Sequence, residues 1–359
     1  MIPFLIEVAS IRLPYYGNPF LAMATYPIKA PFMKTSDLLP PLLSAVWEAS
    51  ACCEAIASEF LDSDHQTKSD RSPVTIADYA SQALILYRLR ALTPDIGVVA
   101  EEAAEGLRTD PDLVERIASF TRRFEPKVNA DTLLELLDRG SHEGGKGTFW
   151  TLDPIDGTKG YLRGGQYAVA VALIEKGHPV LGLLGCPRYE LEEGFTGVVF
   201  SGGEGIPAQV WTGKNATPRK IKSCSEVDFS QARLCESVES AHTAHDLSAK
   251  VIKSLGISSD ILRMDSQAKY ASVAHGASAL YLRLPVKKGY REKIWDHAAG
   301  LAVIEAAGGR VSDLNGKKLD FSQGETLNQN RGVIASNGTL HHAALAALVA
   351  HTPEASRWE

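Results

Sequence analysis

The sequence predicts a two-lobed protein built from mixed α and β layers. Its 359 residues exceed the roughly 250–300 residues at which a single hydrophobic core stops growing. Hydrophobic residues make up 45% and charged residues 22% of the chain, which is typical of a globular protein with a large core. The pattern changes near Gly213, from two helices followed by several strands to alternating helices and strands. We therefore expect an α+β lobe over residues 36–212 and an α/β lobe over residues 213–359.

Apolar periodicity places the first elements. From Ser36 on, apolar residues recur every three or four positions, which predicts a long helix with one buried face. These residues are Leu42, Val46, Ala49, Cys53, Ile56 and Phe60. A polar loop then leads into a second helix from about Ala77. The segment DIGVVAEE predicts a short strand that ends at Glu101 and Glu102.

The stretch from Arg108 to Gly147 is charged and carries one helical patch, DTLLELLDRG, so we expect a surface insertion or a lid. After it, GTFWTLD predicts a strand that again ends in an acid. The runs QYAVAVALIEKG and HPVLGLLGCP predict two paired strands joined by a turn at Lys176 and Gly177. Strands outnumber helices in this part of the chain.

Beyond Gly213, helical and strand patterns alternate. The segments are AHDLSAKVIKSLG, QAKYASVAHGASALYLRL, IWDHAAGLAVIEAAGG, RVSDLNGKKLDF and GVIASNG. The third of them predicts a long helix that Gly308 and Gly309 end as a left-handed C-cap. The chain has no internal repeat and no low-complexity tract.

Charge, hydropathy and cysteine usage exclude several classes of protein. A formal net charge of -6 argues against nucleic-acid partners, which favour a basic domain, so we expect a small-molecule partner. No apolar run reaches the roughly 18 residues that span a bilayer, so we expect no membrane anchor. The five cysteines lack CxxC spacing, which favours a packing role and a reducing, cytoplasmic location. We expect a monomer.

Residues 1–35 form a separate extension in this prediction. They contain one acidic residue, several prolines and no steady period. Two interpretations stay open. The extension is either an organelle-targeting peptide, although such peptides are richer in Arg and Ser, or a disordered segment particular to this chain.

The segment WTLDPIDGTKGY holds Asp153 and Asp156 close together, although two carboxylates about 4 Å apart repel by roughly 4 kcal/mol at an effective dielectric of 20. Glu101, at another strand end, and Asp296, at the start of a helix, add two acids to the same expected cleft. Mg²⁺ prefers oxygen ligands and often binds substrate phosphate, so the sequence predicts a divalent-cation site. Each acid alone could instead be a solvated turn residue, a strand cap or a helix N-cap.

The residues between and after the two aspartates fit this interpretation. Pro154 constrains the backbone, and the carbonyl of Ile155 is then free to act as a further oxygen ligand. Gly157 and Thr158 offer backbone N–H groups at a predicted helix start, which suits a phosphate.

The motifs VVAEE, DPIDGTKG and WDHAAG resemble the signature of the lithium-sensitive, magnesium-dependent phosphomonoesterases, which include inositol monophosphatase and fructose-1,6-bisphosphatase. The segments SPVTIADYASQ, DSQAKYASVAHG, YLRLP and EKIWDHAAG resemble more closely the 3′(2′),5′-bisphosphate nucleotidases. The resemblance covers about Asp37 to Leu348 and implies an αβαβα sandwich with two lobes and two to three Mg²⁺ ions. The chain departs from the pattern at Ala100 and Ala103, where the family more often has Gly and Ser.

The resemblance also implies roles for single residues. The implied metal ligands are Glu101, Asp153, the carbonyl of Ile155, Asp156 and Asp296. Asp78 and Thr158 correspond to the residues that orient and deprotonate the attacking water. Glu102 fits a position behind the residues that bind the metal. The alternative is that Glu102 is only an exposed acid on the surface.

A second set of residues implies a nucleotide substrate with two phosphates. The implied substrate contacts are Thr158, His242, Ser266, Lys269, Arg283 and Asp296. Ser266 and Lys269 are three residues apart, so on a helix they share a face. In the alternative interpretation, Ser266 is only a helix N-cap and Lys269 is solvated. His242 could likewise have only a structural role. Arg283 lies in an apolar run, where a guanidinium is costly unless an anion pairs with it.

The resemblance thus implies hydrolysis of the 3′-phosphate of 3′-phosphoadenosine 5′-phosphate, giving AMP and phosphate through in-line attack by a metal-activated water. 3′-Phosphoadenosine 5′-phosphosulfate is expected as a further substrate, and Li⁺ as an inhibitor. Two alternatives remain, an inositol polyphosphate 1-phosphatase and a nucleotide-binding sensor with little turnover. The presence of Asp78 and Thr158 weighs against the sensor.

Overall fold

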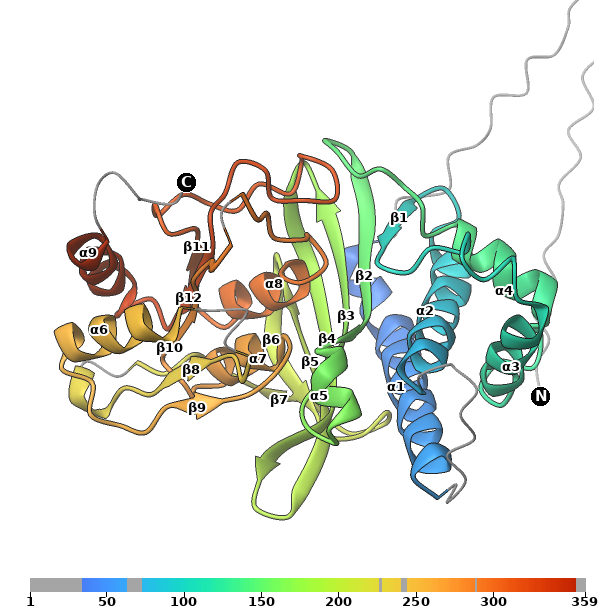
Figure 1. Ribbon diagram of the computed structural model, residues 1–359, viewed down its shortest axis with the longest axis horizontal. Helices are drawn as coiled ribbons and strands as arrows, with labels where there is room; N and C mark the ends of the chain where they lie inside the picture. Colours follow the sequence, from blue (N-terminus) through green and yellow to red (C-terminus); the bar gives the residue numbers. More distant parts are fainter. Residues whose placement is uncertain (1–33, 63–72, 226–227, 240–243, 288, 353–359) are drawn as a thin grey trace, which may run out of the picture. The chain divides into compact units, whose positions relative to one another are not determined.

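The computed structural model describes residues 34–62, 73–225, 228–239, 244–287 and 289–352. Nearly all of the predicted extension lies outside this part of the chain, and so does the predicted substrate contact His242. Residues Thr35–Glu359 form one compact unit, which contains two β-sheets and the helices on their faces (Figure 1).

Two long helices, α1 (Thr35–Asp62) and α2 (Pro73–Leu92), cover one face of the first sheet (Figure 1). The predicted first helix is confirmed, and its apolar positions such as Leu42 and Val46 are fully buried. The second helix begins at Pro73, earlier than the predicted Ala77. Proline fits there because the first turn of a helix needs no backbone N–H donor.

The first sheet has seven strands, whose spatial order follows the chain. They are β1 (Gly97–Ala100), β2 (Thr148–Asp156), β3 (Ala168–Glu175), β4 (His178–Glu192), β5 (Phe195–Gly203), β6 (Ile206–Trp211) and β7 (Arg219–Lys220). β1 and β2 are parallel, and the other neighbouring strands are antiparallel. The predicted turn between β3 and β4 is confirmed, since Lys176 and Gly177 have the positive φ angles of 51° and 76° that tight hairpins require.

The segment between β1 and β2 folds as two helices, α3 (Pro111–Arg122) and α4 (Ala130–Asp138). Asp110 caps α3 and Asn129 caps α4, each by accepting a hydrogen bond from the backbone. The apolar faces of both helices are buried in the core that contains α2. The segment is therefore a surface insertion of two packed helices (Figure 1), whose charges lie on the outer faces, and not a lid.

The second sheet has five strands in the order β11-β12-β10-β8-β9. They are β8 (Leu234–Glu236), β9 (Leu262–Arg263), β10 (Leu280–Arg283), β11 (Arg310–Ser312) and β12 (Val333–Ser336). The 3₁₀ helix η1 (Phe229–Gln231) precedes β8, and four α-helices flank the sheet: α6 (His245–Leu255), α7 (Ala268–Ala274), α8 (Ala298–Ala306) and α9 (His341–His351). Gly308 follows α8 with a φ of 86°, so the predicted left-handed stop is confirmed.

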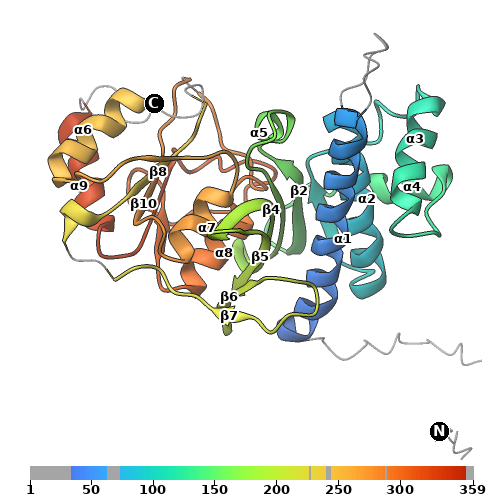
Figure 2. The same cartoon turned by 90° about the horizontal axis from the view of Figure 1, so that it is seen from below.

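Alternating side chains of the strands bind these elements into layers. In β3, Val169 and Val171 pack against α1 and α2, whereas Ala170 and Ala172 face the core of α7 and α8. The far side of that core is the second sheet, whose opposite face carries α6 and α9 (Figures 1 and 2). The order is thus helices, sheet, helices, sheet, helices, which confirms the predicted αβαβα sandwich. The lobe boundary at residue 213 stays a prediction.

Glycines in the first sheet let α8 lie directly on the strands. A Cβ atom on Gly182 in β4 would lie 2.4 Å from the carbonyl oxygen of Ala299, and one on Gly202 in β5 would lie 2.8 Å from the Cβ of Ala306. Real atoms do not approach this closely, so only glycine fits. The spacing between α8 and the sheet also determines where Asp296, two residues before α8, lies relative to β2.

Two further expectations from composition concern the cysteines and membrane anchoring. The five cysteines form no disulfides; Cys52, Cys53, Cys186 and Cys235 are buried and Cys224 is half-buried, which agrees with packing roles. None of the described helices combines the length and the apolar character needed to cross a bilayer.

Candidate active site

A cavity of about 300 Å³ opens where the end of β2, the short helix α5 (Thr158–Leu162) and the start of α7 meet the segment before α8. All five predicted metal ligands line it: Glu101, Asp153, Ile155, Asp156 and Asp296. Thr158, Ser266, Lys269 and Arg283 line it as well. The fold therefore brings most of the predicted site residues to one place, although they come from the segment after β1, from β2, α5, α7 and β10, and from the segments just before α7 and α8.

The acids at the end of β2 are held close together by a local irregularity of the strand. The pairing of β2 with β3 shifts register between Asp153 and Asp156, and the Ile155 amide donates a hydrogen bond of 3.1 Å to Asp153 Oδ1. Carboxylate oxygens of Asp153, Asp156 and Asp296 lie within 4.8 Å of one another. Asp296 does not cap α8, because His297 occupies the cap position.

Burial makes the negative charge of this cluster costly. It raises the pKa of Glu101 to about 8, and the neighbouring acids add to the increase. Burial and the neighbouring carboxylates raise the pKa of Asp153 well above its usual range. Burial also raises the pKa of Asp296 to about 6, although the Arg283 guanidinium opposes the increase. Asp153 is buried, Asp156 and Asp296 are half-buried and Glu101 is exposed at the edge of the cavity. Four neighbouring acids with oxygen donors fit a hard divalent cation, whose charge would compensate theirs.

Helix α5 begins next to the acids, as predicted. Gly157 precedes it with a φ of 88°, and a Cβ atom there would lie 2.9 Å from the Cβ of Ser266. Glycine at this position therefore allows α5 to touch the segment that leads into α7. The Thr158 hydroxyl donates a hydrogen bond of 3.4 Å to the Ile155 carbonyl, and Asp156 Oδ2 accepts one of 2.6 Å from the Gln267 amide.

Asp78 lies in α2, close to the acids of β1. Its side chain is buried, and burial together with Glu102 and Glu101 raises its pKa well above the usual range. Gln82, one turn further along α2, holds the Glu102 backbone through two hydrogen bonds of 2.6 and 3.1 Å. Within the described part of the chain, no hydrogen bond joins Asp78 to Thr158, so their shared role stays a prediction.

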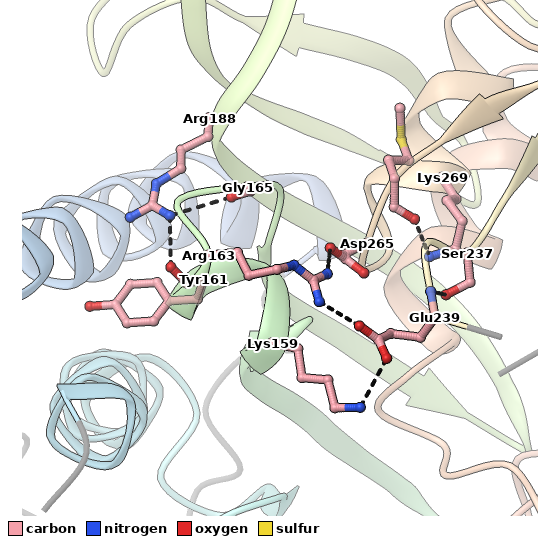
Figure 3. Close-up of polar contacts among 10 residues, drawn as sticks. Lys159, Tyr161, Arg163, Gly165, Arg188, Ser237, Glu239, Asp265 and Lys269 are labelled. Atoms are coloured by element: carbon pink, nitrogen blue, oxygen red, sulfur yellow. Dashed lines mark hydrogen bonds and ion pairs between the residues drawn. The ribbon is translucent and has the colours of Figure 1, made fainter. Parts of the chain in front are cut away.

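Lys269 differs from the solvated lysine of the alternative interpretation. Its side chain is 3% exposed, and Nζ lies 5.3 Å from the centre of the Tyr281 ring. Nζ donates a hydrogen bond of 3.2 Å to the Met264 carbonyl (Figure 3), and no carboxylate among the described residues pairs with it. Burial lowers the pKa of this ammonium. The cavity wall thus holds a buried cation with no carboxylate of the described residues at ion-pair distance, although Asp156 and Asp265 lie near enough to oppose the fall in its pKa.

Ser266 lies before the first residue of α7, so it does not share a regular helical face with Lys269 as expected. Its backbone has a φ of 65°, which is unusual for a residue other than glycine. The hydroxyl accepts a hydrogen bond of 3.1 Å from the Ala268 amide. Gln267 occupies the cap position of α7, so Ser266 is not the helix N-cap of the alternative interpretation either. Both side chains nevertheless line the cavity.

Arg283 ends β10 and has its counter-ion within the protein. Its Nε donates to Glu292 Oε2 at 2.8 Å, and its terminal nitrogen lies 3.5 Å from Asp296 Oδ2. We expected an anion to pair with this guanidinium, and the Glu292 carboxylate is that anion. Burial of Arg283 alone therefore does not require a substrate phosphate.

The sequence reasoning missed a group of charges around α5 (Figure 3), of which Lys159, Glu239 and Asp265 line the cavity. Lys159 and Arg163 of α5 both pair with Glu239, and Arg163 also pairs with Asp265 at 2.6 Å. The two cations lower the pKa of Glu239 to about 2. The sequence offered one signal for this group, a lysine and an arginine four residues apart within a recognised motif. It did not reveal their partners, because these lie more than seventy residues away in the chain.

The layered fold and the oxygen-donor cluster define a candidate metal-dependent hydrolase. The sequence matches the Inositol monophosphatase family over residues 36–354, and the chain belongs to this family.

Curated relatives extend the match. A 3′(2′),5′-bisphosphate nucleotidase of Emericella nidulans is 41% identical over 313 residues, which cover 79% of this chain and 89% of the relative. The enzyme of the same name from Oryza sativa is 40% identical, over 85% of this chain and 91% of the relative. Among solved structures, an inositol monophosphatase from Anabaena matches with a TM-score of 0.58 at 21% identity, over 90% of this chain and 100% of that one. The Thermotoga maritima enzyme also has a TM-score of 0.58, at 20% identity, with 89% and 98% coverage.

Proposed function

We propose that this protein is a 3′(2′),5′-bisphosphate nucleotidase that hydrolyses 3′-phosphoadenosine 5′-phosphate to AMP and phosphate. The observation that carries the proposal is Lys269, a buried ammonium without a carboxylate partner in the described structure, which lines the same cavity as the acids. A substrate with one phosphate needs only the acid end of this cavity. A second phosphate would supply the anion that Lys269 lacks.

The acid end of the cavity would hold the metal. Glu101, Asp153, Asp156, Asp296 and the Ile155 carbonyl offer oxygen donors that suit two to three Mg²⁺ ions. Divalent cations bound there would neutralise the charge on the scissile phosphate and activate the attacking water.

The remaining roles belong to side chains of the protein. Asp78, whose buried carboxyl has a raised pKa, would accept the proton of the attacking water, and Thr158 would orient that water. Arg283 would direct its terminal nitrogen to the uncleaved phosphate, with Ser266 beside it. His242 is proposed as a nucleotide contact on sequence grounds alone.

The proposal has two extensions. The phosphosulfate analogue of the substrate carries the same 3′-phosphate, so we expect it to be hydrolysed too. We also propose that the protein acts as a monomer in the cytoplasm on small molecules, which size-exclusion chromatography and cell fractionation would test.

A comparison of kcat/KM with Mg²⁺ tests the proposed reaction. The substrates are 3′-phosphoadenosine 5′-phosphate, adenosine 3′-phosphate and inositol 1,4-bisphosphate, and phosphate release is measured. We expect the first to be preferred over both others, and excess chelator to abolish its hydrolysis. Preference for the inositol bisphosphate would favour the polyphosphate 1-phosphatase, and nucleotide binding without phosphate release would favour the sensor.

A further inference from the structure

Behind the candidate active site lies a buried chain of polar side chains that the sequence reasoning did not single out. The Tyr270 hydroxyl lies 2.7 Å from His297 Nδ1, and His297 Nε2 lies 3.2 Å from Glu292 Oε2. Because an ionised carboxylate only accepts hydrogen bonds, Nε2 is the donor. The same oxygen of Glu292 accepts the 2.8 Å hydrogen bond from Arg283 Nε. The chain therefore ends on the guanidinium that lines the cavity.

The backbone holds Glu292 firmly in this position. The Leu327 amide donates to the Glu292 carbonyl at 2.9 Å, and the Ile294 amide donates to the Glu325 carbonyl at 3.0 Å. The Glu292 side chain is 6% exposed and that of His297 only 1%. A fixed and buried carboxylate of this kind sets the orientation of the arginine that it binds.

We propose that Glu292 is a positioning residue that neutralises the Arg283 guanidinium and limits its contact with Asp296 to the observed 3.5 Å, so that Asp296 stays available to a divalent cation. The inference rests on the proposed function, in which Asp296 is a metal ligand. It assigns to Glu292 a task that is distinct from binding either metal or substrate.

The distances support this division of tasks. Within the described ranges, Glu292 and Asp296 are the two carboxylates that pair with Arg283, at 2.8 and 3.5 Å. The shorter contact neutralises the guanidinium and leaves only a weak one to Asp296. Without the negative charge of Glu292, the guanidinium would have Asp296 as its remaining partner. A buried cation moves toward the nearest available anion, and it would then compete with the metal for the same oxygens.

The substitution E292Q tests the inference, since it removes the charge with little change of volume. Isothermal titration calorimetry with Mn²⁺, on the full chain without substrate, measures metal affinity apart from turnover. A charge-assisted hydrogen bond corresponds to a change of about 10- to 150-fold, so we expect the Kd for Mn²⁺ to rise by at least about tenfold. In the double variant E292Q/R283Q the competing cation is gone, and affinity should return close to that of the wild type. The inference is wrong if folded E292Q binds Mn²⁺ as tightly as the wild type.

Two further variants make the result specific. Glu236 is an equally buried glutamate that pairs with Arg263 at 2.9 Å outside the metal cluster, so E236Q should leave the Kd for Mn²⁺ unchanged. If E292Q does not fold, R283Q alone provides the test, since removal of the guanidinium should leave metal affinity equal or higher. A loss of affinity in R283Q would overturn the inference.

The variant D296N separates this inference from the proposed function. It should weaken Mn²⁺ binding if Asp296 is a ligand. A loss in D296N without a loss in E292Q would overturn the positioning role alone. No loss in either variant would overturn both that role and the proposed metal site.

Discussion

Replacement of Lys269 by methionine removes one charge from the cavity wall and keeps a side chain of similar length. In the described structure Nζ has one hydrogen bond, to the Met264 carbonyl, and no carboxylate partner. If a substrate phosphate is its missing partner, K269M loses a charge-assisted hydrogen bond worth about 1.5–3 kcal/mol. This corresponds to a fall of about 10- to 150-fold in kcat/KM for 3′-phosphoadenosine 5′-phosphate, mostly through KM.

The free energy of unfolding should respond differently. A buried ammonium without an ionic partner destabilises the fold, and an apolar side chain of the same shape is neutral or stabilising. K269M should therefore be as resistant to urea as the wild type, or more so.

The assay compares two substrates and one control variant. Adenosine 3′-phosphate lacks the second phosphate, so its kcat/KM should change much less in K269M. Lys214 is half-exposed and pairs with Glu48 at 2.8 Å outside the cavity, so K214M should leave both substrates unaffected. Equal losses for the two substrates in K269M, or a marked loss of stability, would refute the reasoning and assign Lys269 to support of the fold.

Three further predictions concern catalysis, pH and packing. D78N and T158V should each lower kcat by orders of magnitude while KM moves little; a normal kcat with a raised KM would assign these residues to substrate binding. Glu101 has a folded pKa of about 8 against an ordinary 4.5, so native protein retains a proton that unfolded chains have lost. Urea denaturation in chelator should therefore show the free energy of unfolding falling from about pH 6.5 to pH 8, above the range in which buried histidines titrate. The fall should be smaller than the full pKa shift implies, because Glu101 is exposed and water screens its charge, and saturating Mg²⁺ should remove the effect; a free energy of unfolding that rises with pH would contradict it. G160A would place a methyl group 2.0 Å from a backbone oxygen and should cost several kcal/mol by urea denaturation, of order 2–4, whereas G106A meets no atom within 4 Å; equal stability of the two would contradict the packing argument.

The features that the sequence predicted well are those with a local cause. The first helix has a regular apolar stripe, the β3–β4 hairpin has two strand patterns around Lys176 and Gly177, and the acids of β2 lie within one motif. Helix α3 was missed because charged residues hide its apolar positions, although Asp110 before Pro111 was an available start signal.

The partners of the site residues could not be predicted in the same way. Glu292 lies nine residues after Arg283 with a strand end and a loop between them, and Glu239 lies 76 residues after Arg163. Such pairs form only when the layers pack, so no spacing rule reveals them. The resemblance identified which residues meet at the cavity. It did not show that Arg283 has its own counter-ion, or that the described residues provide none for Lys269.

The contact between α8 and the glycines of the first sheet affects how variants of this protein should be interpreted. Gly182 does not line the cavity, yet a side chain there would push α8 outward and carry Asp296 away from the acids of β2. In a survey of random variants, such a change would look like the loss of a metal ligand. A map of functional positions drawn from phenotypes would therefore include residues in the middle of the sheet. A screen for altered cation requirement would miss these residues if it covered only those that line the cavity.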